Sequence, residues 1–199
     1  LNISTNGVLK LMGINPEDEE ETVTEEEILM MSDAGAEKGT IDEDDNRIIK
    51  NIFEFDDLTA EQVCTHRTDV VMLWAEEDVE TWEKTIHRTR HSLFPICGES
   101  IDNIIGILNA KDYFRLTDKS RENIMKNAVR EPYFVHETMK ADVLFAQMKK
   151  RGAHHFAVVV DEYGGTTGII TVTDLVEELV GEFDDDEMMD EIDEEEVAV

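Results

Sequence analysis

Three polar side chains near the end of the chain have the types and spacing for binding a nucleoside phosphate. Thr171, Thr173 and Asp174 lie where an apolar β-type run turns directly into a helical pattern. The first backbone N–H groups of a helix have no partner within the helix and lie at the positive end of its dipole, so they attract an anion. A threonine hydroxyl adds a donor for phosphate, and a nearby carboxylate accepts from both ribose hydroxyls. The turn therefore predicts a nucleoside-phosphate site.

The same turn also suits a purely structural role. Thr173 or Asp174 is a good helix N-cap, and Asp174 followed by Glu177 imitates a capping box. Capping and ligand binding are both open interpretations of these residues. His154 and His155, just before the preceding apolar strand, are further candidate phosphate donors, although a histidine at a strand end more often has no ligand.

The turn belongs to the second copy of an internal repeat. The run 106–112 (Gly-Ile-Leu-Asn-Ala-Lys-Asp) has the same order of residue types as the run that starts 62 positions later at Gly168. One copy cannot bury its own sheet, so we expect two copies to share a core in an α+β fold. In the first copy Asn109 replaces the threonine, so a second site at Asn109 and Asp112 is expected to be weaker.

The pattern of apolar residues predicts the elements that position these side chains. In the first copy we expect strands at 70–74, 93–97 and 104–108 and helices at 78–90 and from Ala110. In the second we expect strands at 133–135, 155–160 and 167–171 and helices at 141–151 and 174–180. Upstream, Thr24 and Glu27 form a capping box that starts a helix, Gly35 and Gly39 are expected to stop it, and further helices are expected at 42–55 and 59–62.

Composition restricts the function classes. The chain has 199 residues, of which 48 are acidic and 18 basic, for a net charge of −30. This charge opposes nucleic acid and anionic membranes, so no nucleic-acid partner is expected. Two cysteines give no disulfide framework and fit a reducing compartment. There is no apolar run long enough to cross a bilayer, so the chain is expected to be soluble and cytoplasmic, and its apolar start suggests a fragment of something longer.

Neither a metal site nor an enzyme is predicted. His87 and His91 have the i, i+4 spacing of a helical zinc pair but lack the adjacent glutamate, and Cys64 and Cys97 have no C-x-x-C spacing. The acidic stretch after Gly181 lacks the order of a calcium-binding loop. No nucleophile–base set or paired carboxylates stand out.

The doubled unit resembles a tandem pair of cystathionine-β-synthase (CBS) domains. The runs 67–71 (Arg-Thr-Asp-Val-Val), 91–92 (His-Ser), 101–112 and 161–182 are more narrowly similar to the CorC/HlyC group of haemolysin-like and magnesium/cobalt efflux proteins, related to the cyclin-M transporters. The stretch 25–55 resembles the helical connector that precedes the CBS pair in that group. Leu93 departs from the pattern, because the group usually has an arginine there.

The resemblance implies two β-α-β-β-α CBS units packed as a pseudo-twofold pair behind a short helical connector. It implies a membrane-proximal segment and acidic linker at 1–24 and a helical connector at 25–62. A CBS pair follows at 63–182, with its units at about 68–116 and 130–180, and an acidic tail at 183–199. It also implies AMP or ATP, with Mg²⁺ possible through the nucleotide, bound by Thr68, Asp69, Val70, His155, Phe156, Thr171, Thr173 and Asp174.

The expected function is therefore a regulatory module on the cytoplasmic side of a CorC/HlyC-type membrane Mg²⁺/Co²⁺ transport protein. Its expected partners are the nucleotide, a second copy in a homodimer, and an upstream transmembrane domain. The alternative is a structural dimerisation module with an empty cleft. A weaker third idea is direct sensing of divalent ions by the acidic surface.

Overall fold

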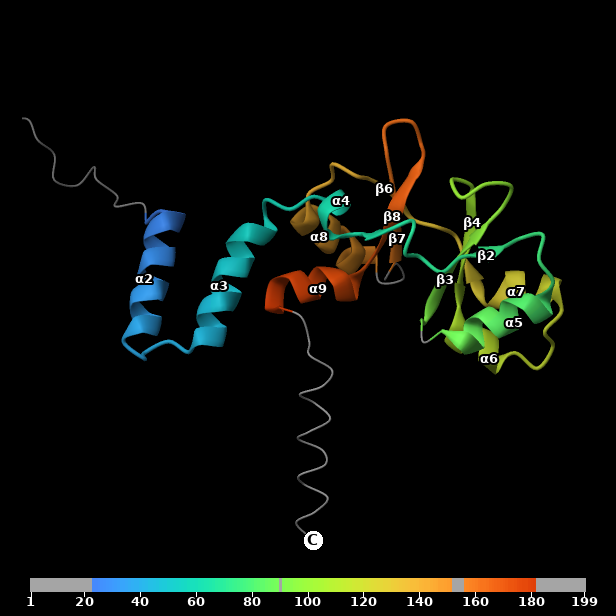
Figure 1. The fold of residues 1–199 in the computed structure, drawn as a ribbon, viewed down its shortest axis with the longest axis horizontal. Helices are drawn as coiled ribbons and strands as arrows, with labels where there is room; N and C mark the ends of the chain where they lie inside the picture. Colours follow the sequence, from blue (N-terminus) through green and yellow to red (C-terminus); the bar gives the residue numbers. More distant parts are fainter. Residues whose placement is uncertain (1–22, 90, 152–155, 182–199) are drawn as a thin grey trace, which may run out of the picture. The chain divides into compact units, whose positions relative to one another are not determined.

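The computed structural model describes residues 23–89, 91–151 and 156–181, and the chain divides into two compact parts, 1–50 and 51–199 (Figure 1). Within these residues no helix combines the length and apolar character needed to span a membrane. The expected acidic tail, the segment 1–22, the candidate donor His154 and the predicted site residue His155 lie outside the described residues.

The first part contains helix α2 (Glu25–Glu37) and most of α3 (Glu43–Phe55). The predicted capping box is confirmed, because Thr24 and Glu27 exchange side chain to backbone hydrogen bonds. The expected stop at Gly35 is wrong, since α2 continues to Glu37. A Cβ on Gly35 would press on the Ile41 side chain, so this glycine serves close packing, and Gly39, with φ +69°, makes the turn.

The second part contains two four-stranded sheets, one for each copy of the repeat (Figure 1). The first sheet has the order β2 (Leu73–Trp74), β3 (Leu93–Cys97), β4 (Ile104–Asn109) and β5 (Val129–Arg130). The second has the order β1 (Thr65–His66), β8 (Thr166–Thr171), β7 (Phe156–Val160) and β6 (Phe134–His136). In each copy the first strand pairs in parallel and the hairpin is antiparallel, as a β-α-β-β order requires.

A β-bulge recurs at the same place in both hairpins, which confirms the repeat. The ladder between β3 and β4 skips Ile105, and the ladder between β7 and β8 skips Thr167, which lies 62 positions later. A bulge lets two neighbouring residues oppose one on the partner strand and bends the hairpin. The two copies therefore share backbone detail beyond their apolar pattern.

The helices of each copy cover one face of its own sheet (Figure 1). In the first copy these are α5 (Val79–Arg88), α6 (Ala110–Arg115) and α7 (Arg121–Asn127), packed around the buried Trp82 and Tyr113. In the second they are α4 (Ala60–Val63), α8 (Ala141–Arg151) and α9 (Val172–Val180), packed around Leu144 and Ile170. A third cluster joins the copies through Cys97, Ile104, Ile107, Phe156 and Val158.

The α+β class is confirmed, and two expected boundaries in the second part are corrected. Only Leu73–Trp74 of the expected strand 70–74 pairs, because Val70 and Val71 lie in an extended linker. Helix α9 begins at Val172, two residues before its expected start, with Thr171 as its N-cap. Helix α7 and strand β5 were not expected from the sequence pattern.

Candidate functional site

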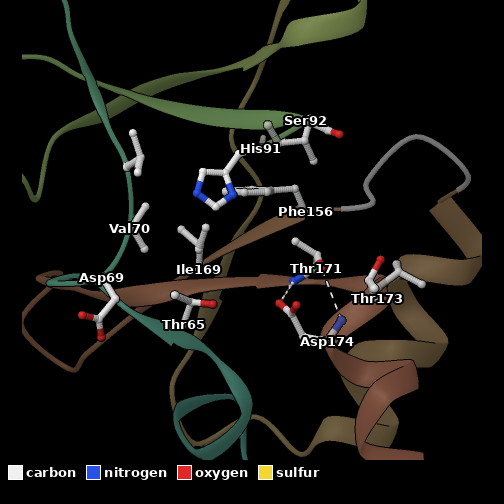
Figure 2. A pocket seen from close by; sticks show the side chains of 13 residues that line it. Thr65, Asp69, Val70, His91, Ser92, Phe156, Ile169, Thr171, Thr173 and Asp174 are labelled. Carbon is white, nitrogen blue, oxygen red and sulfur yellow. Dashed lines mark hydrogen bonds between the residues drawn. The ribbon is translucent and has the colours of Figure 1, made fainter. Parts of the chain in front are cut away.

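A cavity of about 530 Å³ lies where the two copies of the repeat meet (Figure 2). The linker after β1, the start of β3, the facing ends of β7 and β8, and the start of α9 all contribute to its wall. The lining residues are Thr65, Asp69, Val70, Val71, His91, Ser92, Leu93, Phe156, Ile169, Thr171, Val172, Thr173 and Asp174. The wall thus combines apolar side chains with hydroxyls, two carboxylates and an imidazole.

One side of the cavity is the junction between β8 and α9, where a strand runs into a helix without a loop. Thr171 caps the helix: its Oγ accepts from the Asp174 backbone N–H at 3.2 Å, and the Asp174 carboxylate accepts from the Thr171 N–H at 2.7 Å. The junction is therefore capped, but the predicted cap residues are wrong: Thr171 is the N-cap instead of Thr173 or Asp174, and the capping box pairs Thr171 with Asp174 instead of Asp174 with Glu177. Register places Phe156 of β7 directly opposite Thr171.

Capping leaves both side chains with further hydrogen-bonding capacity. The Thr171 hydroxyl accepts from Asp174 N–H and keeps its own proton to donate. Asp174 uses Oδ2 for the cap, so Oδ1 retains its lone pairs for another donor. The N–H groups of Val172 and Thr173 occupy the first turn of α9, where a helix has no internal acceptors for them. A capping role and a ligand-binding role are therefore compatible at this junction.

The opposite side is the linker that follows β1, and it is anchored to both copies. The Arg67 N–H donates to the Thr167 carbonyl at 3.0 Å, and the Arg67 guanidinium lies 3.2 Å from the Thr166 carbonyl and 3.4 Å from the Asp102 carboxylate. Asp102, from the turn between β3 and β4, also accepts from the Thr166 N–H at 2.8 Å. These contacts fix the position at which Asp69 and Val70 enter the cavity.

Close packing behind the cavity depends on one glycine. Gly168 of β8 pairs with His66 of β1, and a Cβ at this position would overlap the Thr65 carbonyl oxygen and press on the Cys64 sulfur. Because Thr65 lines the cavity, the approach of β1 to β8 helps set the cavity's shape. The glycine is needed here for close approach of two backbones.

Six of the residues predicted from the sequence line this cavity, namely Asp69, Val70, Phe156, Thr171, Thr173 and Asp174. Thr68 is not among the lining residues, and its hydroxyl lies 2.9 Å from His66 Nδ1. Sequence reasoning left Thr65, Val71, His91, Ser92, Leu93, Ile169 and Val172 out of the predicted site. The register of β8 could have indicated Ile169, because it lies on the same face as Thr171.

The weaker second position has a different environment. Asn109 caps α6 by accepting from the Asp112 N–H at 3.2 Å. The Asp112 carboxylate lies 3.3 Å from the Arg130 guanidinium and 3.7 Å from that of Arg115. Asp112 is therefore neutralised by arginine, whereas Asp174 forms no ion pair within the described residues.

Neither cysteine is chemically activated. Burial raises the pKa of Cys64 to about 11, with Glu61 contributing, and burial raises the pKa of Cys97 to about 11. Both thiols are thus protonated at neutral pH, when a nucleophile or metal ligand must be a thiolate. Among the described residues, no three histidine, cysteine or acidic side chains form a group that could hold a metal ion.

Comparison with known proteins identifies the family. Residues 122–181 match the CBS domain model, and residues 1–45 match the model of the cyclin M transmembrane N-terminal domain. The chain is 32% identical to the solved CBS domain of a bacterial CNNM/CorC family Mg²⁺ transporter, with a TM-score of 0.71 over 82% of this chain and 99% of that one. The chain belongs to the CBS-domain proteins of the CNNM/CorC family. The resemblance drawn from the sequence is confirmed.

One curated relative and one further solved structure extend the comparison. The UPF0053 protein YugS of Bacillus subtilis is 33% identical over 192 residues, which cover 96% of this chain but only 44% of YugS. A solved CBS domain of a bacterial CNNM/CorC family Mg²⁺ transporter in complex with ATP is 33% identical, with a TM-score of 0.60 over 68% of this chain and 96% of that one. The matched families are regulatory or transport families and not typical enzymes.

Proposed function

We propose that this CBS module binds an adenine nucleotide, AMP or ATP, and thereby regulates a CorC/HlyC-type membrane protein that transports Mg²⁺ or Co²⁺. The observation that carries the proposal is that Thr171 and Asp174 from one copy of the repeat face the same cavity as Asp69 and Val70 from the linker to the other (Figure 2). The related CBS domain in complex with ATP supports the ligand class.

The chemistry of the wall matches the parts of a nucleotide. The Thr171 hydroxyl and the first N–H groups of α9 would donate to a phosphate, aided by the helix dipole. Asp174 would accept from the ribose hydroxyls through Oδ1, and Val70, Phe156 and Ile169 would contact the base. Thr173 lies at the phosphate end. Thr68 and His155 remain candidates for further contacts with the nucleotide. Asn109 and Asp112 remain candidates for a weaker second nucleotide site.

Magnesium would enter with the nucleotide. The described part of the chain offers no group of three ligands for a metal, so the phosphates of ATP would have to supply most of the coordination. Mg²⁺ would also neutralise part of the phosphate charge of ATP, which Asp69 and Asp174 would otherwise repel. The expected ligand is therefore the nucleotide, and Mg²⁺ would bind only as part of its complex with the nucleotide.

The last turn of α9, at the end away from the cavity, contacts the end of the connector. The Asn51 side chain, near the end of α3, donates to the Leu179 carbonyl at 3.3 Å. Nucleotide bound at the start of α9 would thus stabilise a helix whose last turn holds the end of α3. We assign the module to the cytoplasmic side of the membrane, with an upstream transmembrane domain and a second copy as its partners.

Thermal unfolding with added ligand tests this function. A ligand at one hundred times its Kd stabilises the folded state by about 2.7 kcal/mol. We expect AMP, or ATP with Mg²⁺, to raise the unfolding temperature, and guanosine nucleotides to raise it less. If no adenine nucleotide shifts the transition, nucleotide binding is wrong. If Mg²⁺ alone gives the full shift, the module senses the ion directly.

The second candidate is a structural dimerisation module with an empty cleft. The observation in its favour is that Thr171 and Asp174 already satisfy each other as a cap. This function predicts a dimer whose melting is unaffected by every nucleotide. Sedimentation with and without AMP separates the two, because only the regulatory module would couple ligand binding to its assembly or connector.

A further inference from the structure

The two sheets have structurally equivalent edge strands. Thr65 of β1 lies opposite Ile169 of β8, and Arg130 of β5 lies opposite Ile107 of β4, in antiparallel ladders. Ile107 and Ile169 are 62 positions apart, which is the period of the repeat. Arg130 is therefore the counterpart of Thr65, although these two residues do not share that spacing in the sequence.

The two counterparts meet the acidic residue of their own copy differently. Figure 2 shows Thr65 in the cavity wall between Asp69 and Asp174, and Asp174 keeps Oδ1 for another donor. In the first copy the Arg130 guanidinium lies 3.3 Å from Oδ2 of Asp112, the counterpart of Asp174. A guanidinium is a permanently charged donor that matches a carboxylate. The protein itself thus supplies a donor where the ribose hydroxyls would need an acceptor.

The difference begins at the helix caps. In the second copy the Asp174 carboxylate accepts from the Thr171 N–H at 2.7 Å, which holds it at the start of α9. In the first copy the Asn109 N–H donates to the Ala128 carbonyl at 2.8 Å instead. Because that N–H has another acceptor, the Asp112 carboxylate is left to pair with the arginines of β5 and α6.

We propose that Arg130 sets the order of affinity of the two nucleotide positions: by occupying the ribose acceptor Asp112, it makes the position in the first copy the weaker one. This inference rests on the proposed function and adds a specificity-determining residue to it. The Arg130 and Asp112 side chains are 59% and 26% exposed, so solvent screens their attraction. A pair of this kind can reduce the affinity of a competing donor by about fivefold.

Calorimetric titration with AMP and with 2′,3′-dideoxy-AMP tests the inference. Asp174→Ala removes the stronger position, so that the weaker one is measured by itself. In this background we expect Arg130→Thr, which copies the residue type of Thr65, to raise AMP affinity about fivefold. The dideoxy analogue lacks the ribose hydroxyls but keeps the phosphate, so its affinity should not rise.

Arg115→Thr is the matched control. Arg115 also lies beside Asp112, at 3.7 Å, but it extends from α6 and is 79% exposed. Its replacement should change AMP affinity by less than about twofold. Asp112→Ala should abolish the gain that Arg130→Thr produces. If Asp174→Ala does not unfold cooperatively, the gain is measured in Arg130→Thr alone, as a second equivalent of AMP bound more tightly than in wild type.

The outcomes separate this inference from the function on which it rests. Equal effects of Arg130→Thr and Arg115→Thr would reflect net charge alone and would overturn the inference. An equal gain with the dideoxy analogue would also overturn it, because Arg130 would then not compete with ribose. Two equally tight equivalents of AMP in wild-type protein would do the same. If neither wild type nor Arg130→Thr binds AMP at all, the proposed function itself is wrong.

Discussion

Thr171 and Asp174 exchange two hydrogen bonds at the start of α9, at 2.7 Å and 3.2 Å, and both face the cavity between the copies of the repeat. The cap fixes the position of the threonine hydroxyl and of the free carboxylate oxygen before any ligand arrives. A polar pair held in this way loses little side-chain entropy on binding. Stability and affinity are therefore linked at this junction.

Replacing Thr171 by valine should affect both properties. The variant keeps the shape of the side chain but loses the acceptor for Asp174 N–H and the donor for phosphate. We expect stability to fall by about 1 kcal/mol, as for other lost N-caps, and AMP affinity to fall at least tenfold. Thr171→Ser is the matched control and should retain both. Urea denaturation and calorimetry measure the two effects, and undiminished affinity in the valine variant would remove Thr171 from the site.

The junction shows how far the sequence determines the site. Thr171 and Asp174 could be found because their spacing and the repeat identify a strand that turns into a helix. The cap was assigned to Thr173 or Asp174 because a pattern of apolar residues does not locate the first helical residue to better than a few positions. Asp69 and Val70 came from family resemblance and not from their own chemistry.

Two of the lining residues missed from the sequence lie just before β3. His91 and Ser92 lie far from Thr171 in sequence and reach the cavity only because the two sheets pack together through Phe156 and Ile107. No local pattern encodes that approach. Helix α7 and strand β5 were missed because each is short, at 7 and 2 residues, with few apolar positions to reveal a period.

Asp102 should position the linker without touching the ligand. It accepts from the buried Thr166 N–H and lies beside Arg67, which leads directly to Asp69. Asp102→Ala leaves that N–H without its acceptor, so we expect a loss of about 1 to 3 kcal/mol in stability and a several-fold loss of AMP affinity. Asp102→Asn keeps an acceptor and should lose much less of both. Equal behaviour of the two variants in denaturation and titration would show that the hydrogen bond is unimportant.

The paired glycines of the repeat should differ in their tolerance of a side chain. A Cβ on Gly168 would overlap the Thr65 backbone carbonyl, whereas a Cβ on the equivalent Gly106 would overlap the Val129 side chain. A side chain can rotate away, but the backbone of β1 cannot move without opening the sheet. We expect Gly168→Ala to destabilise by about 1 to 3 kcal/mol, more than Gly106→Ala, and to weaken AMP binding. The reverse order of stabilities would contradict this account.

Both cysteines should resist alkylation in the folded protein. Burial raises the pKa of both thiols to about 11, above the ordinary range of a cysteine. At about pH 8 the thiolate fraction, and with it the rate of reaction with iodoacetamide, should be on the order of one hundredfold lower than in the unfolded chain. Because the raised pKa favours the folded state only while the thiols are protonated, stability should fall as pH rises from about 9 to about 11. Mass spectrometry of wild type and Cys64→Ser separates the two sites, and fast labelling of the folded protein at about pH 8 would contradict the burial argument.

Hydrogen exchange can show whether α9 carries the signal to the connector. Asn51 donates to the Leu179 carbonyl at the end of α9, and nucleotide would bind at its start. We expect AMP to slow amide exchange in α9 and in the last turn of α3, because stabilising α9 also stabilises the acceptor that holds Asn51. Asn51→Ala should keep AMP affinity within about twofold, because Asn51 does not line the cavity and a substitution outside the contacts with the ligand changes binding by about 0.5 kcal/mol or less. This variant should nevertheless lose the protection of α3 from amide exchange.

Asn127→Ala, an amide change at the end of α7, is the control and should leave the protection of α3 in place. Protection of α3 that survives Asn51→Ala would mean that the coupling takes another path.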